Sequence, residues 1–156
     1  MKGANLTDFF ISWCNQNEIR LGIVESRSGT PVYLNINNTF CYLKYANLAS
    51  AGNYYFGFAT KDVESNFRNS AFSIIVCGEG EINHVFIIPS RVLAVFLMEG
   101  RPVGKRRAVY EEYQAKIFPH RNFEMTVTHR RTNPVDMRQF EIALTRGEIM
   151  RNVTVG

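Results

Sequence analysis

Two short apolar runs, FSIIVCG at 72–78 and HVFIIP at 84–89, constrain the fold of this chain more than any other feature. Both are rich in β-branched and aromatic residues and lack the polar alternation of a half-buried strand. Such runs are typical of strands that are buried on both faces. The five residues between them, EGEIN, predict a turn. We therefore expect two neighbouring buried strands here.

Further strand signals surround this pair. The segment GIVESRSGTPVYLNI (22–36) predicts a hairpin that turns at Ser28-Gly29, and NTFCYLKYANL (38–48) predicts a third strand. GNYYFGFAT (52–60) predicts a fourth, and NFEMTVTH (122–129) predicts one more. Strands outnumber helices, and short connections favour antiparallel neighbours. The fold class expected is α+β, with a mostly antiparallel central sheet or pseudobarrel flanked by a few helices.

Helices are expected at three places. The first spans 7–20, where Thr7 is the expected cap and apolar residues recur at helical spacing. The second is RVLAVFLM, capped by Ser90. A short third helix is expected in VDMRQFEIAL (135–144), followed by a frayed tail. The polar segment 62–70 predicts a short helix or a loop, and YEEYQAKIF has no clear class.

The three cysteines are single and widely separated, which argues against a zinc site and favours free, reduced thiols. No run of 18 apolar residues is present, and the N-terminus lacks the apolar core of a signal peptide. These observations predict a cytoplasmic protein with no membrane partner. No cofactor is expected, with magnesium required only if the chain is a nuclease.

Positive charge is concentrated in the last third of the chain. Residues 1–77 hold six Lys or Arg and five Asp or Glu, whereas residues 101–131 hold eight Lys or Arg and three Glu. A basic region on a globular protein favours phosphate-bearing partners, and the alternative is a solvated basic surface with no partner. The charge distribution is therefore compatible with a nucleic-acid partner, and the partner that the leading hypothesis expects is double-stranded DNA.

The cations of GRPVGKRR and of the segment around 120–133 are the candidate contacts. Arg130 and Arg131 precede a turn stiffened by Pro134, and a stiff turn suits the bidentate contact of arginine with a guanine edge. We expect at least one of these two arginines to read a base. The full set of candidate DNA-binding residues is Lys44, Arg101, Lys105, Arg106, Arg107, Arg121, Arg130, Arg131 and Asn133.

The motifs "YLKYAN", "YYFGFA" and "FSIIVCGEGEINHVFIIPSRVL" give residues 33–97 a resemblance to small restriction-endonuclease-like, or PD-(D/E)xK, domains. This resemblance implies a divalent metal held by an Asp on one strand and by an acidic residue or Gln two positions before a Lys on the next. Only Lys44 matches that pattern. Tyr42 stands where the second acidic residue belongs, and the first falls near Asn35 or Asn37.

A second resemblance, on architecture alone, is to the β-pseudobarrel DNA-reading domains of some restriction enzymes and of plant transcription factors. The leading hypothesis is a single DNA-binding domain over 1–156, sequence- or modification-specific and without catalysis of its own. It belongs to a restriction-type system and acts with a fused or separate nuclease or motor subunit. Excision from a larger restriction or mobile-element protein stays open. The alternatives are a magnesium-dependent endonuclease with an altered site and a protein-interaction domain with an incidental basic surface.

Overall fold

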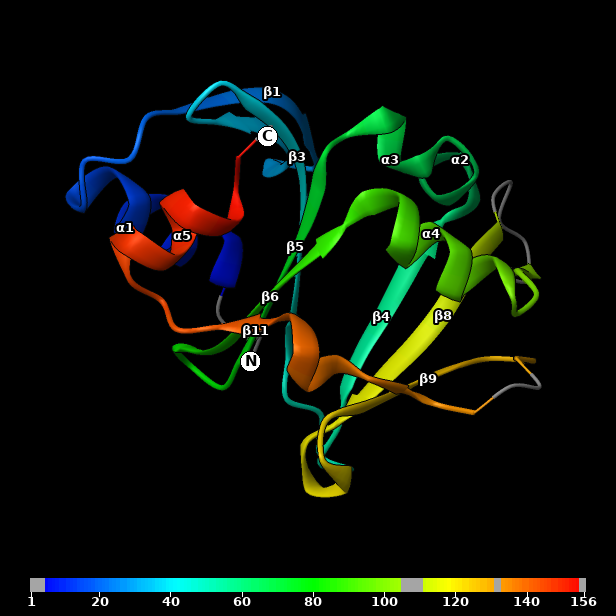
Figure 1. The fold of residues 1–156 in the computed structure, drawn as a ribbon. Helices are drawn as coiled ribbons and strands as arrows, with labels where there is room; N and C mark the ends of the chain where they lie inside the picture. Colours follow the sequence, from blue (N-terminus) through cyan, green and yellow to red (C-terminus); the bar gives the residue numbers. More distant parts are fainter. Residues whose placement is uncertain (1–4, 105–110, 131–132, 155–156) are drawn as a thin grey trace.

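A computed structural model describes residues 5–104, 111–130 and 133–154. Two β-sheets and a set of helices build the α+β fold that the sequence predicts (Figure 1). The larger sheet stands at the centre, with helices on one face and the second sheet and further helices on the other. In the described part of the chain, no helix combines the length and apolar character needed to cross a membrane.

The larger sheet contains the hairpin, the third strand and the two buried strands that the sequence predicts. Its strands, in spatial order, are β1 (Leu21–Arg27), β2 (Thr30–Ile36), β3 (Thr39–Asn47), β5 (Phe72–Gly78), β6 (Ile82–Pro89) and β11 (Glu141–Ile142). All neighbours are antiparallel except β3 and β5, which run parallel. The parallel pair arises because β4 and two short helices intervene in the sequence and return the chain to its starting edge.

The second sheet contains the predicted fourth strand and the segment of uncertain class. Its order is β10 (Val135–Asp136), β9 (Glu124–Val127), β8 (Glu111–Phe118) and β4 (Tyr54–Ala59), and β7 (Val103–Gly104) also pairs with β8. The segment at 111–118 has no clear class by sequence because apolar residues (Tyr113, Ala115, Ile117) alternate with polar ones (Glu112, Gln114, Lys116), and an apolar Phe118 then follows. The pairing with β4 and β9 determines its conformation.

Helices cover the larger sheet on both sides (Figure 1). The helix α1 (Leu6–Gln16) and the helix α5 (Arg146–Asn152) pack on one face, around a cluster that includes Leu34, Leu43 and Ile149. On the other face lie the second sheet and three helices, around an aromatic cluster that includes Tyr42 and Phe58. These three helices are α2 (Thr60–Glu64), α3 (Asn66–Asn69) and α4 (Ser90–Met98).

Both predicted helix caps are wrong. The N-cap of α1 is Asn5, whose side chain accepts a hydrogen bond from the Asp8 backbone N–H, and Thr7 lies inside the helix in a buried position. Ser90 is the first residue of α4 and caps nothing with its side chain. The Ser90 hydroxyl is instead buried and bonds the hydroxyls of two other serines, at 2.7 and 2.8 Å. In both cases tertiary burial outweighs the local preference for capping.

The C-terminal segment also differs from the prediction. Residues 135–144 form a 3₁₀-helix (Met137–Phe140) between the short strands β10 and β11, and not a longer α-helix. The tail is not frayed, because α5 begins after Thr145, whose hydroxyl accepts from the Glu148 N–H. Ile149 is fully buried in the core and holds this helix against the sheet.

The three cysteines are free and buried, as predicted. Burial raises the pKa of the Cys14 thiol to about 12. It also raises the pKa of the Cys41 thiol to about 12, against a small lowering by a backbone hydrogen bond. Since the thiolate is the reactive form, these groups act as small apolar side chains at neutral pH.

Candidate functional site

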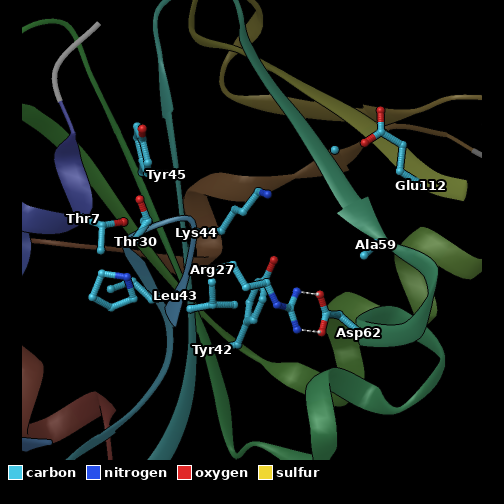
Figure 2. A pocket seen from close by; sticks show the side chains of 13 residues that line it. Thr7, Arg27, Thr30, Tyr42, Leu43, Lys44, Tyr45, Ala59, Asp62 and Glu112 are labelled. Atoms are coloured by element: carbon cyan, nitrogen blue, oxygen red, sulfur yellow. Dashed lines mark hydrogen bonds and ion pairs between the residues drawn. The ribbon is translucent and has the colours of Figure 1, made fainter. Parts of the chain in front are cut away.

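A pocket of about 380 Å³ lies between the first strands of the larger sheet and the strand β4 (Figure 2). Its walls come from α1, β1, β2 and β3 on one side and from β4, α2 and β8 on the other. Lys44, the one residue that matches the nuclease pattern, lies in this pocket together with two carboxylates, Asp62 and Glu112. Neither carboxylate belongs to the strands on which that pattern looks for its acids.

Strand alternation determines where Lys44 points. Tyr42 and Lys44 are two apart on β3 and share the face directed to the second sheet. Tyr42 is buried against Phe67, with ring centroids 4.5 Å apart. Lys44 is only half-buried, and its Nζ lies 6.0 Å from the centre of the Phe58 ring. The aromatic ring of Tyr42 therefore fills the core, and Lys44 extends into the pocket beside it (Figure 2).

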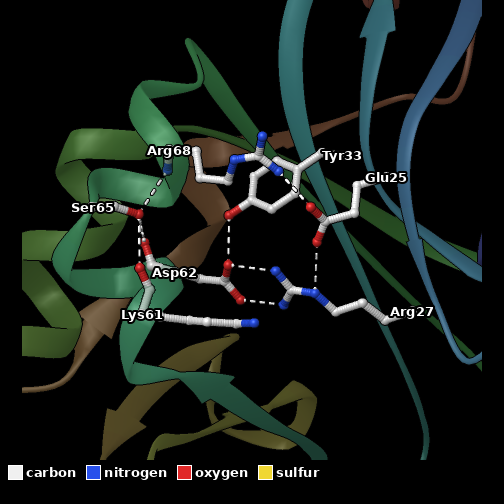
Figure 3. Close-up of polar contacts among 7 residues, drawn as sticks. All are labelled: Glu25, Arg27, Tyr33, Lys61, Asp62, Ser65 and Arg68. Carbon is white, nitrogen blue, oxygen red and sulfur yellow. Dashed lines mark hydrogen bonds and ion pairs between the residues drawn. The ribbon is translucent and has the colours of Figure 1, made fainter.

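Asp62 anchors an ionic network along one side of the pocket (Figure 3). Its two oxygens accept hydrogen bonds from Arg27 at 2.6 and 3.0 Å, and one of them also accepts from the Tyr33 hydroxyl at 2.7 Å. Glu25 extends the network by pairing with Arg27 at 2.9 Å and with Arg68 at 2.6 Å. The network links the edge strand β1 to the segment that follows β4.

The charge state of Asp62 follows from these contacts. Burial of the carboxyl opposes its ionisation, but the hydrogen bonds from Arg27 and Tyr33 outweigh burial and lower the pKa of Asp62 below its usual value. Burial and the neighbouring Asp62 raise the pKa of the Tyr33 hydroxyl above its usual range. Asp62 is therefore an anion that is already saturated with donors, and Tyr33 stays a neutral donor to it.

The second carboxylate, Glu112, occupies the space that a side chain at position 57 would fill. It is buried on β8, opposite Ala59 in the pairing with β4. Its Oε1 accepts from the Tyr55 hydroxyl at 3.1 Å and from the Gln114 amide at 3.3 Å. A Cβ on Gly57 would lie only 2.3 Å from its Oε2, so this arrangement requires glycine there. The carboxylate is thus held in one place by the residues around it.

Thr7 contributes an unsatisfied hydroxyl to the pocket. Its side chain is fully buried, and its Oγ1 has no hydrogen-bond partner, the one such buried side-chain atom among the residues that the structure describes. Thr30, another residue of the pocket, accepts a hydrogen bond from the Asn5 amide at 3.2 Å. Buried hydroxyls are nearly always bonded in folded proteins, so the unpaired Thr7 hydroxyl is an exception to that rule.

The metal site implied by the nuclease resemblance has a poor donor set here. Tyr42 is buried in the aromatic core, Asn35 is exposed, and Asn37 lies in a turn with φ 51°. Within 5–104, 111–130 and 133–154, no three side chains of His, Cys, Asp or Glu are grouped closely enough to hold a metal ion. Asp62 already binds an arginine through both oxygens.

The predicted DNA-binding residues do not form one cluster. Lys105, Arg106, Arg107 and Arg131 lie outside the described residues. Arg101 and Asn133 are exposed and lie with Arg130 at one end of β8 and β9. Arg121 follows the opposite end of β8, and Lys44 lies in the pocket.

Arg130, the expected base reader, is held by the protein itself. Its Nε donates to Glu99 at 2.5 Å, a second guanidinium nitrogen donates to the Asn133 carbonyl, and the side chain is only 9% exposed. The contacts with Glu99 and with the Asn133 carbonyl thus hold this guanidinium inward. Reaching a base edge would require breaking both contacts.

The outer face of the second sheet carries a cross-strand row of aromatic, cationic and hydroxyl side chains. Tyr55 on β4 lies directly opposite Lys116 on β8, which in turn lies opposite Thr126 on β9. Tyr55 is 43% exposed and Lys116 is exposed. At the end of β8, the Arg121 guanidinium lies 4.5 Å from the centre of the Phe118 ring. Aromatic and cationic groups therefore alternate across this face, which is the pattern of a stacking surface for bases.

The sequence analysis also missed Asp62, Glu112 and Thr7. Each is an ordinary polar residue in its own segment, and the three are separated by more than 40 residues from one another along the chain. No short-range pattern indicates such a grouping. The chain matches no protein-family model, no curated protein and no solved structure.

Proposed function

We propose that this chain is a DNA-binding module without catalysis of its own, and that it binds through the outer face of its second sheet. The observation that carries the proposal is the cross-strand row of Tyr55, Lys116 and Thr126. It combines an exposed aromatic ring, a cation and a hydroxyl on a regular surface. Such a surface supports base stacking, phosphate contact and hydrogen bonding at once.

Charge at both ends of this face supports the same function. Arg101 is exposed at one end, and His120 and Arg121 are exposed at the other. Eight strand residues of β8 separate the two ends, a length of roughly 25 Å at about 3.3 Å per residue. Several backbone phosphates of one DNA strand fit within that length. Cations at the two ends of the face can therefore contact different phosphates.

Fluorescence anisotropy with labelled duplex and single-stranded DNA, at increasing salt, tests the proposal. The parent protein should bind, with log affinity falling linearly in log salt at a slope of about −0.9 per phosphate neutralised. Lys116→Gln and Arg121→Gln should each weaken binding and reduce the magnitude of that slope by about 1. Tyr55→Ala should weaken binding without changing the slope, because stacking releases no counterions.

A matched control is Arg151→Gln. Arg151 lies on α5, which covers the other face of the larger sheet, and its side chain is 75% exposed. Arg151→Gln changes the net charge of the protein by the same amount as Lys116→Gln or Arg121→Gln does. An equal loss of affinity in Arg151→Gln would show that the losses in the test variants come from net charge alone. Absence of DNA binding by the parent protein at low salt would refute the proposal.

The endonuclease alternative rests on the presence of Lys44 and two carboxylates in one pocket. Adding magnesium to the same binding reactions and resolving the DNA on a denaturing gel tests it. We expect intact DNA, and cleavage that disappears in Lys44→Ala would establish the alternative instead. The cytoplasm is the compartment that we propose, since the buried free thiols suit a reducing environment.

A further inference from the structure

We infer that a second pocket, which we call the Arg91 pocket, binds the phosphate group of a small ligand. The pocket has a volume of about 260 Å³ and lies where α3 packs beside α4 (Figure 1). Its lining residues are Asn66, Asn69, Ser70, Ala71, Pro89 and Arg91. It shares no lining residue with the pocket around Lys44 or with the outer face of the second sheet, so the inference does not depend on the proposed DNA binding.

The charge of the Arg91 pocket selects an anion. Arg91 is the one charged residue among those that line it, and its side chain is exposed. In the described ranges of the chain, its guanidinium has no ion-pair or hydrogen-bond partner. Other arginines, by contrast, pair with carboxylates: Arg27, Arg68, Arg130, Arg138 and Arg151. A guanidinium whose donors are all available attracts an anion and repels a cation.

Two asparagine amides add uncharged donors to the pocket. Asn66 and Asn69 stand at the two ends of a four-residue turn in which every φ is positive, and asparagine tolerates this conformation better than most residues. Between them the buried Phe67 ring packs on Tyr42 in the core, which holds the turn in place. Neither amide has a hydrogen-bond partner in the part of the chain that the structure describes, so both can donate to a ligand.

A chain of three buried hydroxyls carries one hydrogen without an acceptor. Ser90 shares one hydrogen bond with Ser70, at 2.7 Å, and another with Ser73, at 2.8 Å. Three hydroxyls carry three hydrogens, and these two bonds use two of them. No other described group bonds any of the three hydroxyls. Ser70 is the member that lines the Arg91 pocket, so an acceptor placed there would take the third hydrogen and satisfy the buried chain.

This set of donors suits a phosphate group better than a carboxylate. A guanidinium, two amides and a hydroxyl line one pocket, and they come from two separate segments of the chain. A phosphate group presents oxygens in a tetrahedral arrangement and can accept from several directions, whereas a carboxylate presents two oxygens in one plane. The volume lies just below the roughly 300 Å³ at which pockets for drug-sized ligands begin, so the ligand is small.

Thermal unfolding in inorganic phosphate, with chloride replacing it at constant ionic strength, tests the inference. We expect a saturable rise in Tm of roughly 2–4 °C once phosphate exceeds its dissociation constant about fivefold. Phosphate also stabilises proteins by exclusion from their surface, an effect that does not saturate in this way. Arg91→Gln should keep this general rise and lose the saturable part. Arg151→Gln, the control on another exposed arginine, should keep both.

The serine chain offers a second, matched pair of variants. Ser70→Ala removes the hydroxyl that lines the pocket and should raise the dissociation constant of phosphate severalfold. Ser73→Ala removes the far end of the same chain and should leave the dissociation constant unchanged, because Ser70 keeps its hydrogen for the ligand. If either serine variant fails to fold, Arg91→Gln decides. The absence of a saturable rise in the parent protein, or its full retention in Arg91→Gln, would overturn the inference.

Thymidine 5′-phosphate in place of inorganic phosphate identifies the source of the phosphate group. A lower dissociation constant than that of inorganic phosphate, again lost in Arg91→Gln, would assign the pocket to the phosphate of a nucleotide. An equal or higher dissociation constant would assign it to inorganic phosphate or to a small ester without a base. Both results keep a phosphate group as the ligand.

Discussion

Arg27 binds Asp62 through both carboxylate oxygens, at 2.6 and 3.0 Å, and joins the edge strand of the larger sheet to the helix after β4. The two residues are 35 positions apart in the sequence. Asp62 is nearly fully buried, and Tyr33 donates a third hydrogen bond to it at 2.7 Å. One side of the pocket around Lys44 therefore depends on an ion pair in which the buried Asp62 carboxylate requires the charge of Arg27.

Removing the arginine should be costly. Arg27→Ala leaves the Asp62 carboxylate buried without its charge partner, and we expect a loss of about 3 kcal/mol in the free energy of unfolding. This is the lower end for a broken buried pair, because the Arg27 side chain is itself 32% exposed. Urea denaturation measures the loss. Arg151→Ala, which removes a side chain that is 75% exposed, should change the free energy of unfolding by less than about 1 kcal/mol, and equal losses in the two variants would contradict the argument.

The same pair predicts a stability that falls in acid. The pKa of Asp62 is lower in the folded protein than in the unfolded chain, where it is about 3.9. Its contribution is therefore fully present above that value and is lost as the pH falls through the folded pKa. In urea unfolding at a series of pH values, parent and Asp62→Asn should differ most near neutrality and converge in acid. A difference that is constant with pH would assign the stabilisation to packing.

Gly57 and Glu112 should show energetic coupling. In Gly57→Ala the new methyl group would displace a carboxylate that lies 2.3 Å from the Cβ position, at a cost of about 1–3 kcal/mol. Glu112→Ala removes that obstacle, so the double variant should be more stable than the sum of the single losses implies, by about 1 kcal/mol. Chemical denaturation of all four proteins completes the cycle. Additive losses would mean that Glu112 moves aside without cost.

The predicted strands show which parts of the fold can be inferred from short stretches of the sequence. The runs at 72–78 and 84–89 are apolar throughout, so composition alone indicates that both of their faces are covered. The hairpin at 22–36 has its turn residues in place. The predicted cap of α1 was wrong because Asn5 and Thr7 are both good capping residues by type. Only the packing of α1 on the sheet decides which one is buried.

The candidate site is less accessible to sequence reasoning than the fold. Lys44 was singled out through its strand and its resemblance to a nuclease motif, and the structure places it in a pocket of about 380 Å³. Its neighbours Asp62 and Glu112 come from an irregular excursion and from a strand of the other sheet. Their approach depends on how the second sheet packs on the first, and no periodicity or spacing in the sequence carries that information.

Gly78 should be among the least replaceable residues of the chain. It ends β5 at a register shift, and a Cβ there would lie 1.8 Å from the Glu81 carbonyl oxygen, a backbone atom that cannot rotate away. We expect Gly78→Ala to lose about 3 kcal/mol or more of stability. Gly22→Ala is the control, because nothing lies within 4 Å of its Cβ position, and its stability should change by less than about 1 kcal/mol. Similar melting temperatures for the two would contradict the close approach.

The role of Arg130 has two readings that predict opposite results. As a base reader, Arg130→Lys should lower the ratio of specific to non-specific DNA affinity by roughly 1–3 kcal/mol and leave stability unchanged. In the second reading Arg130 has a structural role. Arg130→Lys then removes its contacts with Glu99 and with the Asn133 carbonyl. Stability then falls by about 1 kcal/mol.

We expect the second result, because the Arg130 side chain is 9% exposed and two of its nitrogens already donate within the protein. Arg101→Lys is the control for the first reading, since Arg101 is exposed at the same end of the sheet. Thermal unfolding and competition binding against random-sequence duplex, measured on the same two variants, separate the readings. A drop in specificity with an unchanged melting temperature would show that Arg130 leaves its turn to contact DNA.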